Sequence, residues 1–329
     1  MNKNNLIEKG LYCIIFCGLA VMGVKGLSLF TEPARSQNLN RTVWVTTDIG
    51  GTDPDDIQSL IHLFQYSNIL RIAGVTTGPL GGDLAAAMAV KQRYRNDYQN
   101  FGWEEKGMQA PSSIKLFQGK RNASDFSNTA EVQALVNESR KDIYSPENPL
   151  IILQWGASTD VAAAIRNGLR RNNCFLYAVV GFSPNDFNAR QDREAFEIVR
   201  NTNNLRRIFA DGTIRGMYTG WDLTANRRYV ENQIRPRGRM GRYFFNISEQ
   251  INTGSFSIKM GDSPSVAWAL SSENLSPRRP SWGGRFRSIG NRFWTARRNT
   301  SLGGHAGANT VDRRAITRDW RMQLEFLYG

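Results

Sequence analysis

Apolar segments of strand length alternate with amphipathic segments from residue 42 onward, and this alternation constrains the fold more than any other feature of the sequence. Strands that are apolar throughout are typical of a parallel sheet covered on both faces. The pattern therefore predicts an α/β fold, in which a mostly parallel, Rossmann-like open sheet is flanked by helices. The expected strands are 43–45, 69–76, 150–154 and 175–180, and the expected helices are 57–66, 85–98, 159–169 and 315–327.

Clusters of polar residues follow three of these strands, at residues 48–56, 158–160 and 185–188. In a parallel sheet the carboxyl ends of the strands share one edge, and ligands bind along that edge. We therefore expect the three clusters to converge on one binding site.

The first cluster holds four aspartates within nine residues, Asp48, Asp53, Asp55 and Asp56. Carboxylates this close repel one another unless a cation or protons intervene. Oxygen atoms are the ligands that Ca²⁺ and Mg²⁺ prefer, and the two glycines in the segment let the backbone turn tightly around an ion. A second interpretation is an acidic turn in which Asp53 or Asp55 caps the following helix.

The segment from Thr47 to Asp56 also resembles the signature of the inosine-uridine-preferring nucleoside hydrolases, in which an aspartate, a glycine turn and an Asp-Asp pair follow a strand. Its longer turn is more similar to a divergent, nucleoside hydrolase-like branch related to cellulose-binding proteins. The resemblance implies that Asp48 binds calcium and acts as the general base. It implies further that Asp56 is a calcium ligand and that Asp55 holds ribose hydroxyls, whereas Asp53 has no certain counterpart and could take any of these roles.

Two later segments resemble other parts of the family's calcium site. Residues 155–162 are similar to the segment whose threonine offers its main-chain carbonyl to calcium, which implies that Thr159 is a ligand. Ser158 or Thr159 would also serve as the cap of the next helix. Residues 259–265 are similar to the segment that carries the last calcium aspartate, which implies that Asp262 completes the metal shell.

The residues Asp186-Phe187-Asn188 resemble the family's Glu-Phe-Asn motif, which grips ribose. This implies that Asn188 and Asp186 bind the substrate, although Asp186 is one methylene shorter than the glutamate of the motif. The segment from Trp282 to Arg285 is typical of the divergent branch, so the resemblance extends over nearly all of the chain that follows the N-terminal leader.

The sequence departs from the family pattern at one position. The nucleoside hydrolases commonly place a histidine before the last calcium aspartate to protonate the leaving base, and Gly261 stands there in this chain. Only His62 and His305 are present. His62 lies on an apolar helix and is expected in the core, whereas His305 lies in a glycine-rich segment and is open to either a surface or a site role.

The function implied by the resemblance is that of a calcium-dependent, N-glycosidase-like hydrolase. Its substrate would be a nucleoside or another ribosyl compound, and Asp48 would activate a water that attacks the anomeric carbon. The alternative is a non-catalytic protein that binds carbohydrate or the cell envelope and retains the calcium and sugar pocket. Because the histidine is missing, the sequence does not determine which group leaves or whether the protein turns over a substrate.

The N-terminus predicts export. Lys3 and Lys9 precede an apolar stretch that begins at Leu11, and small residues stand near Ser36 where a signal peptidase would cleave. We expect residues 1–36 to be a signal peptide or an N-terminal anchor, and residues 37–329 to form the nucleoside hydrolase-like domain. The protein would then be secreted or periplasmic. Cys174 is the one cysteine outside this leader, and we expect it to be a buried thiol.

The formal net charge of +13 indicates an affinity for anionic surfaces. The arginines concentrate at 206–242 and 278–321, which is compatible with an envelope or polysaccharide partner or with a solvated basic face. No nucleic-acid-binding motif accompanies the charge, so no specific nucleic-acid partner is expected. The expected ligand is a small riboside or sugar. The sequence is compatible with a homo-oligomer.

Overall fold

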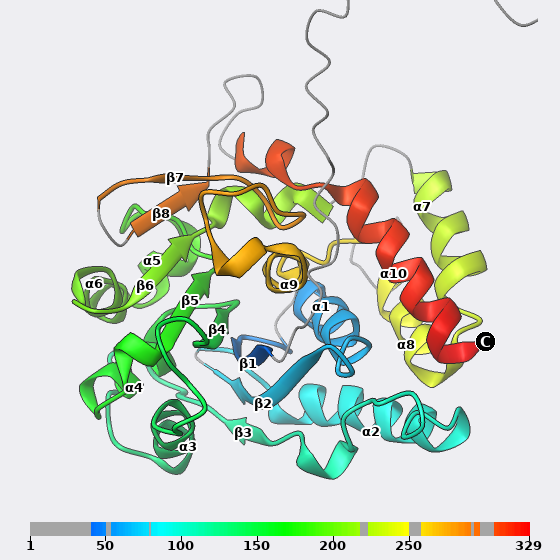
Figure 1. Cartoon of the computed structure of the whole chain (residues 1–329), viewed down its shortest axis with the longest axis horizontal. Helices are drawn as coiled ribbons and strands as arrows, with labels where there is room; N and C mark the ends of the chain where they lie inside the picture. The colour runs from blue at the N-terminus through cyan, green and yellow to red at the C-terminus, as the bar shows by residue number, and fades with distance from the viewer. Residues whose placement is uncertain are drawn as a thin grey trace, which may run out of the picture. The chain divides into compact units, whose positions relative to one another are not determined.

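The computed structural model describes residues 41–50, 54–78, 80–217, 223–249, 258–290, 293–296 and 306–329 (Figure 1). The expected leader at 1–36, Asp53 and His305 lie outside the described residues. Within the described part of the chain, no helix is both long enough and apolar enough to span a membrane.

The described strands form one sheet of eight, in the order β3-β2-β1-β4-β5-β6-β8-β7. Neighbouring strands pair in parallel, except that β7 runs antiparallel to β8 at one edge. The strands are β1 Arg41–Thr47, β2 Leu70–Thr77, β3 Leu116–Gln118, β4 Leu150–Gln154, β5 Cys174–Ala178, β6 Arg206–Phe209, β7 Phe286–Ser288 and β8 Phe293–Ala296. The predicted fold class, a mostly parallel sheet flanked by helices, is thus confirmed.

Helices lie on both faces of the sheet (Figure 1). The α-helices are α1 Asp55–Phe64, α2 Leu84–Asn100, α3 Ala130–Ser139, α4 Thr159–Arg166, α5 Phe187–Gln191, α6 Arg193–Asn201, α7 Leu223–Tyr229, α8 Gly238–Glu249, α9 Ser263–Ser271 and α10 Arg313–Tyr328. The shorter helical turns are η1 Pro111–Ser113, η2 Arg171–Asn173, η3 Asp211–Met217, η4 Val230–Ile234, η5 Glu273–Leu275 and η6 Ala306–Thr310. The eight segments expected from the sequence are present, with ends that differ by a few residues.

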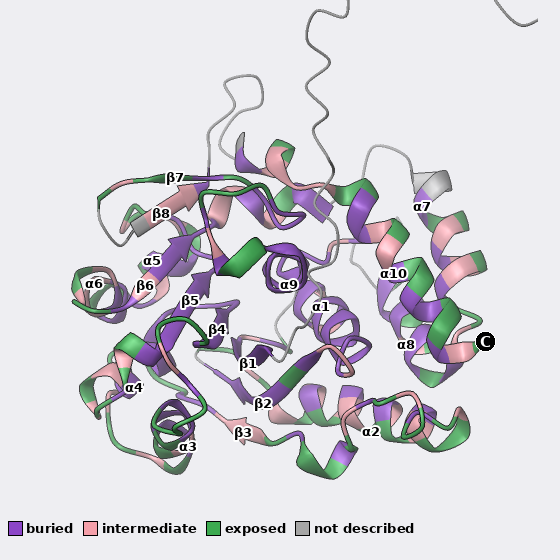
Figure 2. Ribbon diagram, viewed as in Figure 1, coloured by how far each residue is buried: buried purple, intermediate pink, exposed green. Residues whose placement is uncertain are grey.

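Two apolar cores explain why the central strands have no polar face. Successive side chains of a strand point to opposite faces, and in β1 Val43 and Val45 join the core under α1, α2, α8, α9 and α10. Trp44, between them, joins the second core, under α3, α4 and α6. Figure 2 shows the central strands and the helices α1 and α9 as buried, whereas α2 and α10 carry both buried and exposed residues. Both cores pack against the same sheet, so its carboxyl edge is a rigid base for a site.

Candidate functional site

Three buried aspartates from two helices meet at the carboxyl edge of the sheet. Asp55 and Asp56 form the first turn of α1, and Asp262 stands immediately before α9. One carboxylate oxygen from each lies within 4.8 Å of the others. The structure therefore brings together the first and last acidic segments that the sequence assigns to a metal site.

Burial and mutual repulsion act strongly on Asp56. The pKa of Asp56 is raised well above its usual value, first by burial and then by the charges of Asp262, Asp48 and Asp55. The hydroxyl of Thr47 donates a hydrogen bond to the Asp56 carboxylate, which favours its charged form and opposes this shift. Asp48 is thus within electrostatic reach of the three-aspartate group.

Asp48 also lies against the end of strand β4. A Cβ atom at position 156 would stand 3.0 Å from Asp48 Cγ, so the absence of a side chain at Gly156 lets the two segments approach. The main chain continues this contact, because the amide of Trp155 donates to the carbonyl of Thr46 at 2.8 Å. The predicted second cluster therefore begins beside the first.

Buried side chains from three segments hold the main chain around Asp262 in place, and one of them, Gln58, was not singled out by the sequence. The side-chain oxygen of Gln58, on α1, accepts the amides of Lys259 at 2.8 Å and Met260 at 2.9 Å. On the other side, Trp155 Nε1 donates to Ser265 Oγ at 2.8 Å, and Ser265 Oγ donates to the Asp262 carbonyl at 2.6 Å. The only sequence signal for Gln58 was a polar side chain on an otherwise largely apolar helix.

The structure confirms the capping position of Ser158 at α4, whereas the interpretation of Asp55 as the cap of α1 is wrong. Pro54 occupies the N-cap of α1, and Ser158 occupies the N-cap of α4 without a side-chain capping bond. The Ser158 hydroxyl accepts instead from Gln154 Nε2 at 3.0 Å. Thr159 begins α4, and its hydroxyl donates to Asp192 at 2.5 Å. The role of the Thr159 main-chain carbonyl as a metal ligand stays a prediction.

The predicted ribose-binding residues lie at the end of β5. Asn188 is buried, and its Nδ2 atom donates to the Val179 carbonyl at 2.8 Å while its Oδ1 atom accepts from Gln191 at 3.3 Å. Asp186 is half-buried, and its carboxylate accepts the amide of Ser183 at 3.0 Å within its own loop. Asp186 is not one of the residues of the three-aspartate group.

Gly261 is tightly packed at the position where the sequence resemblance leads one to expect a histidine. A Cβ atom at this position would lie 2.6 Å from Asp55 Oδ2 and 2.8 Å from Ile214 Cγ1, so a side chain there would require Asp55 and Ile214 to shift. His62 does not replace it, because its ring is buried between those of Tyr66 and Trp320, with centroids 5.2 Å away in each case. Burial lowers the pKa of His62 to about 3, and the predicted core position is confirmed.

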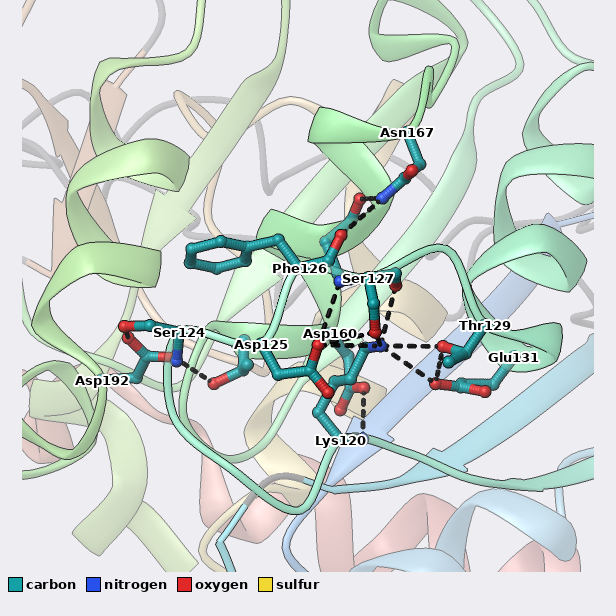
Figure 3. A network of polar contacts seen from close by, with 12 residues as sticks. Lys120, Ser124, Asp125, Phe126, Ser127, Thr129, Glu131, Asp160, Asn167 and Asp192 are labelled. Carbon is teal, nitrogen blue, oxygen red and sulfur yellow. Dashed lines mark hydrogen bonds and ion pairs between the residues drawn. The ribbon is translucent and has the colours of Figure 1, made fainter.

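A second polar network borders the start of α4 (Figure 3). Lys120 is buried, and its Nζ atom donates to the Ser127 carbonyl, the Ser127 hydroxyl and the Thr129 hydroxyl, each at 2.8 Å. The Lys120 amide donates to Asp160 at 2.9 Å, and burial raises the pKa of Asp160 to about 7. The sequence did not single out Lys120, because a lysine before Arg121 is typical of surface charge.

The parallel sheet, with acidic side chains from two helices at its carboxyl edge, defines a nucleoside hydrolase-like α/β protein. Residues 42–173 match the model of a family described as cellulose-binding Sde182, nucleoside hydrolase-like domain, which confirms the resemblance predicted from the sequence. No curated protein sequence matches the chain.

Solved structures show the same fold. A nucleoside hydrolase-related hypothetical protein from Saccharophagus degradans, associated with carbohydrate metabolism, is 20% identical, with a TM-score of 0.62 over 88% of this chain and 72% of that one. The plant nucleoside hydrolase PpNRh1 is 16% identical, with a TM-score of 0.52 over 86% and 98%. The type III effector XopQ, complexed with adenosine diphosphate ribose, is 13% identical, with a TM-score of 0.58 over 90% and 96%.

Proposed function

We propose that the chain is an exported, calcium-dependent hydrolase that cleaves the N-glycosyl bond of a ribosyl compound. The observation that carries the proposal is the group formed by Asp55, Asp56 and Asp262, with Asp48 beside it. Carboxylates buried this close together suit a hard divalent cation, because they supply oxygen ligands and the ion offsets their repulsion. The donor set therefore fits calcium, which Asp48, Asp56, Asp262 and the Thr159 carbonyl would hold, with Asp55 close enough to join.

The reaction needs a base, a sugar grip and a route for the leaving group. Bound calcium would polarise a water molecule and so ease its deprotonation. Asp48 takes a proton from the attacking water. At the same time the water oxygen bonds to the anomeric carbon, and the bond from that carbon to the nitrogen of the leaving group breaks. The nearby carboxylates stabilise the positive charge that develops on the sugar, and Asp55, Asp186 and Asn188 orient its hydroxyls.

This chain differs from the nucleoside hydrolase pattern in the residue that would protonate the leaving group. Position 261 is a glycine and His62 is buried in the core, so neither position supplies an acid to the departing base. General acid catalysis typically contributes about 10²- to 10⁴-fold to a rate. We therefore propose ribosides whose leaving group departs without an acid from either of these positions and can take its proton from solvent.

Release of reducing sugar from a panel of ribosides tests this function. Activity that requires calcium, is abolished by EDTA and falls by at least about 10²-fold in Asp48→Asn would support it. Asp142→Asn is the matched control, because Asp142 is an exposed aspartate far from α1 and α9 in the sequence. Turnover that Asp48→Asn leaves unchanged would exclude the proposed base.

A second candidate function is non-catalytic binding of carbohydrate or an anionic envelope surface. The matched family is described as cellulose-binding, and a hollow of about 460 Å³ is lined by Arg285, Arg313 and Arg314. The aspartate in this hollow, Asp312, already accepts the Ala315 amide at 2.9 Å as the cap of α10. Guanidinium groups around a hollow favour phosphate, sulfate or carboxylate groups.

Sedimentation with insoluble cellulose and with an anionic polysaccharide separates the two candidates. A binder would be retained without sugar release, and retention on the anionic polymer would fall in Arg285→Ala. Arg279→Ala is the control, because Arg279 is exposed and pairs with Glu273 at 2.6 Å. Retention that is insensitive to Arg285→Ala would exclude the arginine-lined hollow as the binding site.

A further inference from the structure

Asp192 is a buried carboxylate that joins three separate segments of the chain. It precedes α6 and accepts the Ala195 amide at 3.0 Å, as a helix cap does. It also accepts the Thr159 hydroxyl at 2.5 Å, the Ser124 amide at 2.8 Å and the Ser124 hydroxyl at 3.3 Å. Capping α6 needs only the first of these bonds, so the others tie α6 to the start of α4 and to the loop that holds Ser124.

That loop, residues 119–129, is itself held at several points (Figure 3). Besides its three hydrogen bonds to Ser127 and Thr129, the buried ammonium of Lys120 lies 3.6 Å from Asp125 and 3.8 Å from Glu131. The amide of Lys120 also binds Asp160, the residue next to Thr159. The loop is therefore bonded to the first turn of α4 in two ways. Lys120 binds Asp160 directly, and Ser124 binds Asp192, which in turn binds Thr159.

A ligand that acts through its main-chain carbonyl sets no requirement on its side chain, so the hydroxyl of Thr159 has a separate use. The capping position of α4 belongs to Ser158, and the Thr159 hydroxyl points to Asp192 instead. This bond fixes the side-chain torsion of Thr159 and, with it, the main chain at the entrance to α4.

We propose that Asp192 is a positioning residue, which holds Thr159 through its hydroxyl so that the Thr159 carbonyl is oriented toward the cation. The inference rests on the proposed function, because it requires calcium at the aspartate group. Groups that orient the ligands of a metal typically change its affinity by about 10- to 100-fold when they are removed. A purely structural Asp192 would stabilise the fold equally with and without the ion.

Calcium titration by calorimetry, with thermal unfolding in EDTA alongside, distinguishes the two roles. Asp192→Asn and Thr159→Val should each weaken calcium binding by about tenfold or more, and the double variant should bind no more weakly than Asp192→Asn alone. Thr159→Ser keeps the hydroxyl and should retain affinity. Ser124→Ala removes only the 3.3 Å bond and is the control on the loop side.

The outcomes separate this inference from the proposed function. A Thr159→Val protein that binds calcium as tightly as the wild type would overturn the positioning role, as would purely additive effects in the double variant. Thr159→Val decides the question even if Asp192→Asn does not fold, because valine has nearly the shape of threonine. A wild-type protein that takes up no calcium would overturn the metal site itself, and the positioning role with it.

Discussion

Gly261 lies directly against Asp55, and a Cβ atom at position 261 would come within 2.6 Å of Asp55 Oδ2. Position 261 is therefore part of the wall of the aspartate group. A side chain introduced at 261 would displace Asp55 or Ile214, so the packing at this glycine and the arrangement of the aspartate group depend on each other.

Gly261→Ala should weaken the protein rather than improve it. The added methyl group must push aside Asp55 or Ile214, and overpacking of this kind typically costs about 1 to 3 kcal/mol. Urea unfolding would measure the loss, and calcium affinity should fall in the same variant. Gly81→Ala is the matched control, because a Cβ atom there meets nothing within 4 Å. Equal stability of the two variants would contradict the packing described here.

Calcium should stabilise the folded protein. A ligand that binds only the native state adds about 2.7 kcal/mol at about a hundredfold excess over its dissociation constant. Thermal unfolding with calcium and with EDTA would show the difference, and Asp262→Asn should abolish it because one of the three close carboxylates becomes neutral. Asp142→Asn should retain the full shift. A melting temperature that is indifferent to calcium would argue against the proposed metal centre.

His62 should make stability fall in mild acid. Its pKa is about 3 in the folded protein, against 6.5 for a histidine exposed to water, so the unfolded chain binds a proton that the folded chain does not. The contribution is complete above pH 6.5 and is lost as the pH falls toward 3, with a cost of about 2 kcal/mol at pH 5. Urea unfolding of the wild type and of His62→Phe at several pH values would measure it, because the difference in stability between the two proteins should change by this amount between pH 6.5 and pH 5.

Lys120→Met should destabilise the protein much more than loss of a surface lysine. It removes an ammonium that is buried and bonded to Ser127 and Thr129, and leaves Asp125 and Glu131 without this partner, which typically costs about 3 to 5 kcal/mol. Lys141→Met, at a half-exposed lysine paired with Glu138, should cost no more than about 1 kcal/mol. Chemical denaturation of both variants provides the comparison.

The sequence predicted the sheet and the local part of the site because both depend on short-range patterns. The apolar runs that became β1, β2, β4 and β5 needed no knowledge of their partners, and the segment from Thr47 to Asp56 carries its ligand chemistry in one stretch. Beyond residue 206 the regular elements α8, α9 and β8 were not predicted. Gly, Arg and aromatic residues are interspersed there, and strand β8 joins the sheet by pairing with β6, which lies more than eighty residues earlier in the chain, as well as with its neighbour β7.

The long-range parts of the site could not be predicted in the same way. The bond from Trp155 to Ser265 and those from Gln58 to residues 259 and 260 join segments far apart in the chain. A buried glutamine or tryptophan has the same sequence signal whether or not it has such a partner. The close approach at Gly261 also depends on Ile214, from a third segment.

The aspartate group draws its members from the two ends of the described domain, since α1 follows the first strand and α9 lies near the last ones. An ion shared by Asp56 and Asp262 would close a loop of about two hundred residues in the chain, much as a crosslink does. Chelation would then loosen the whole domain at once, and resistance to proteolysis would track the calcium concentration even in a protein that cleaves no substrate.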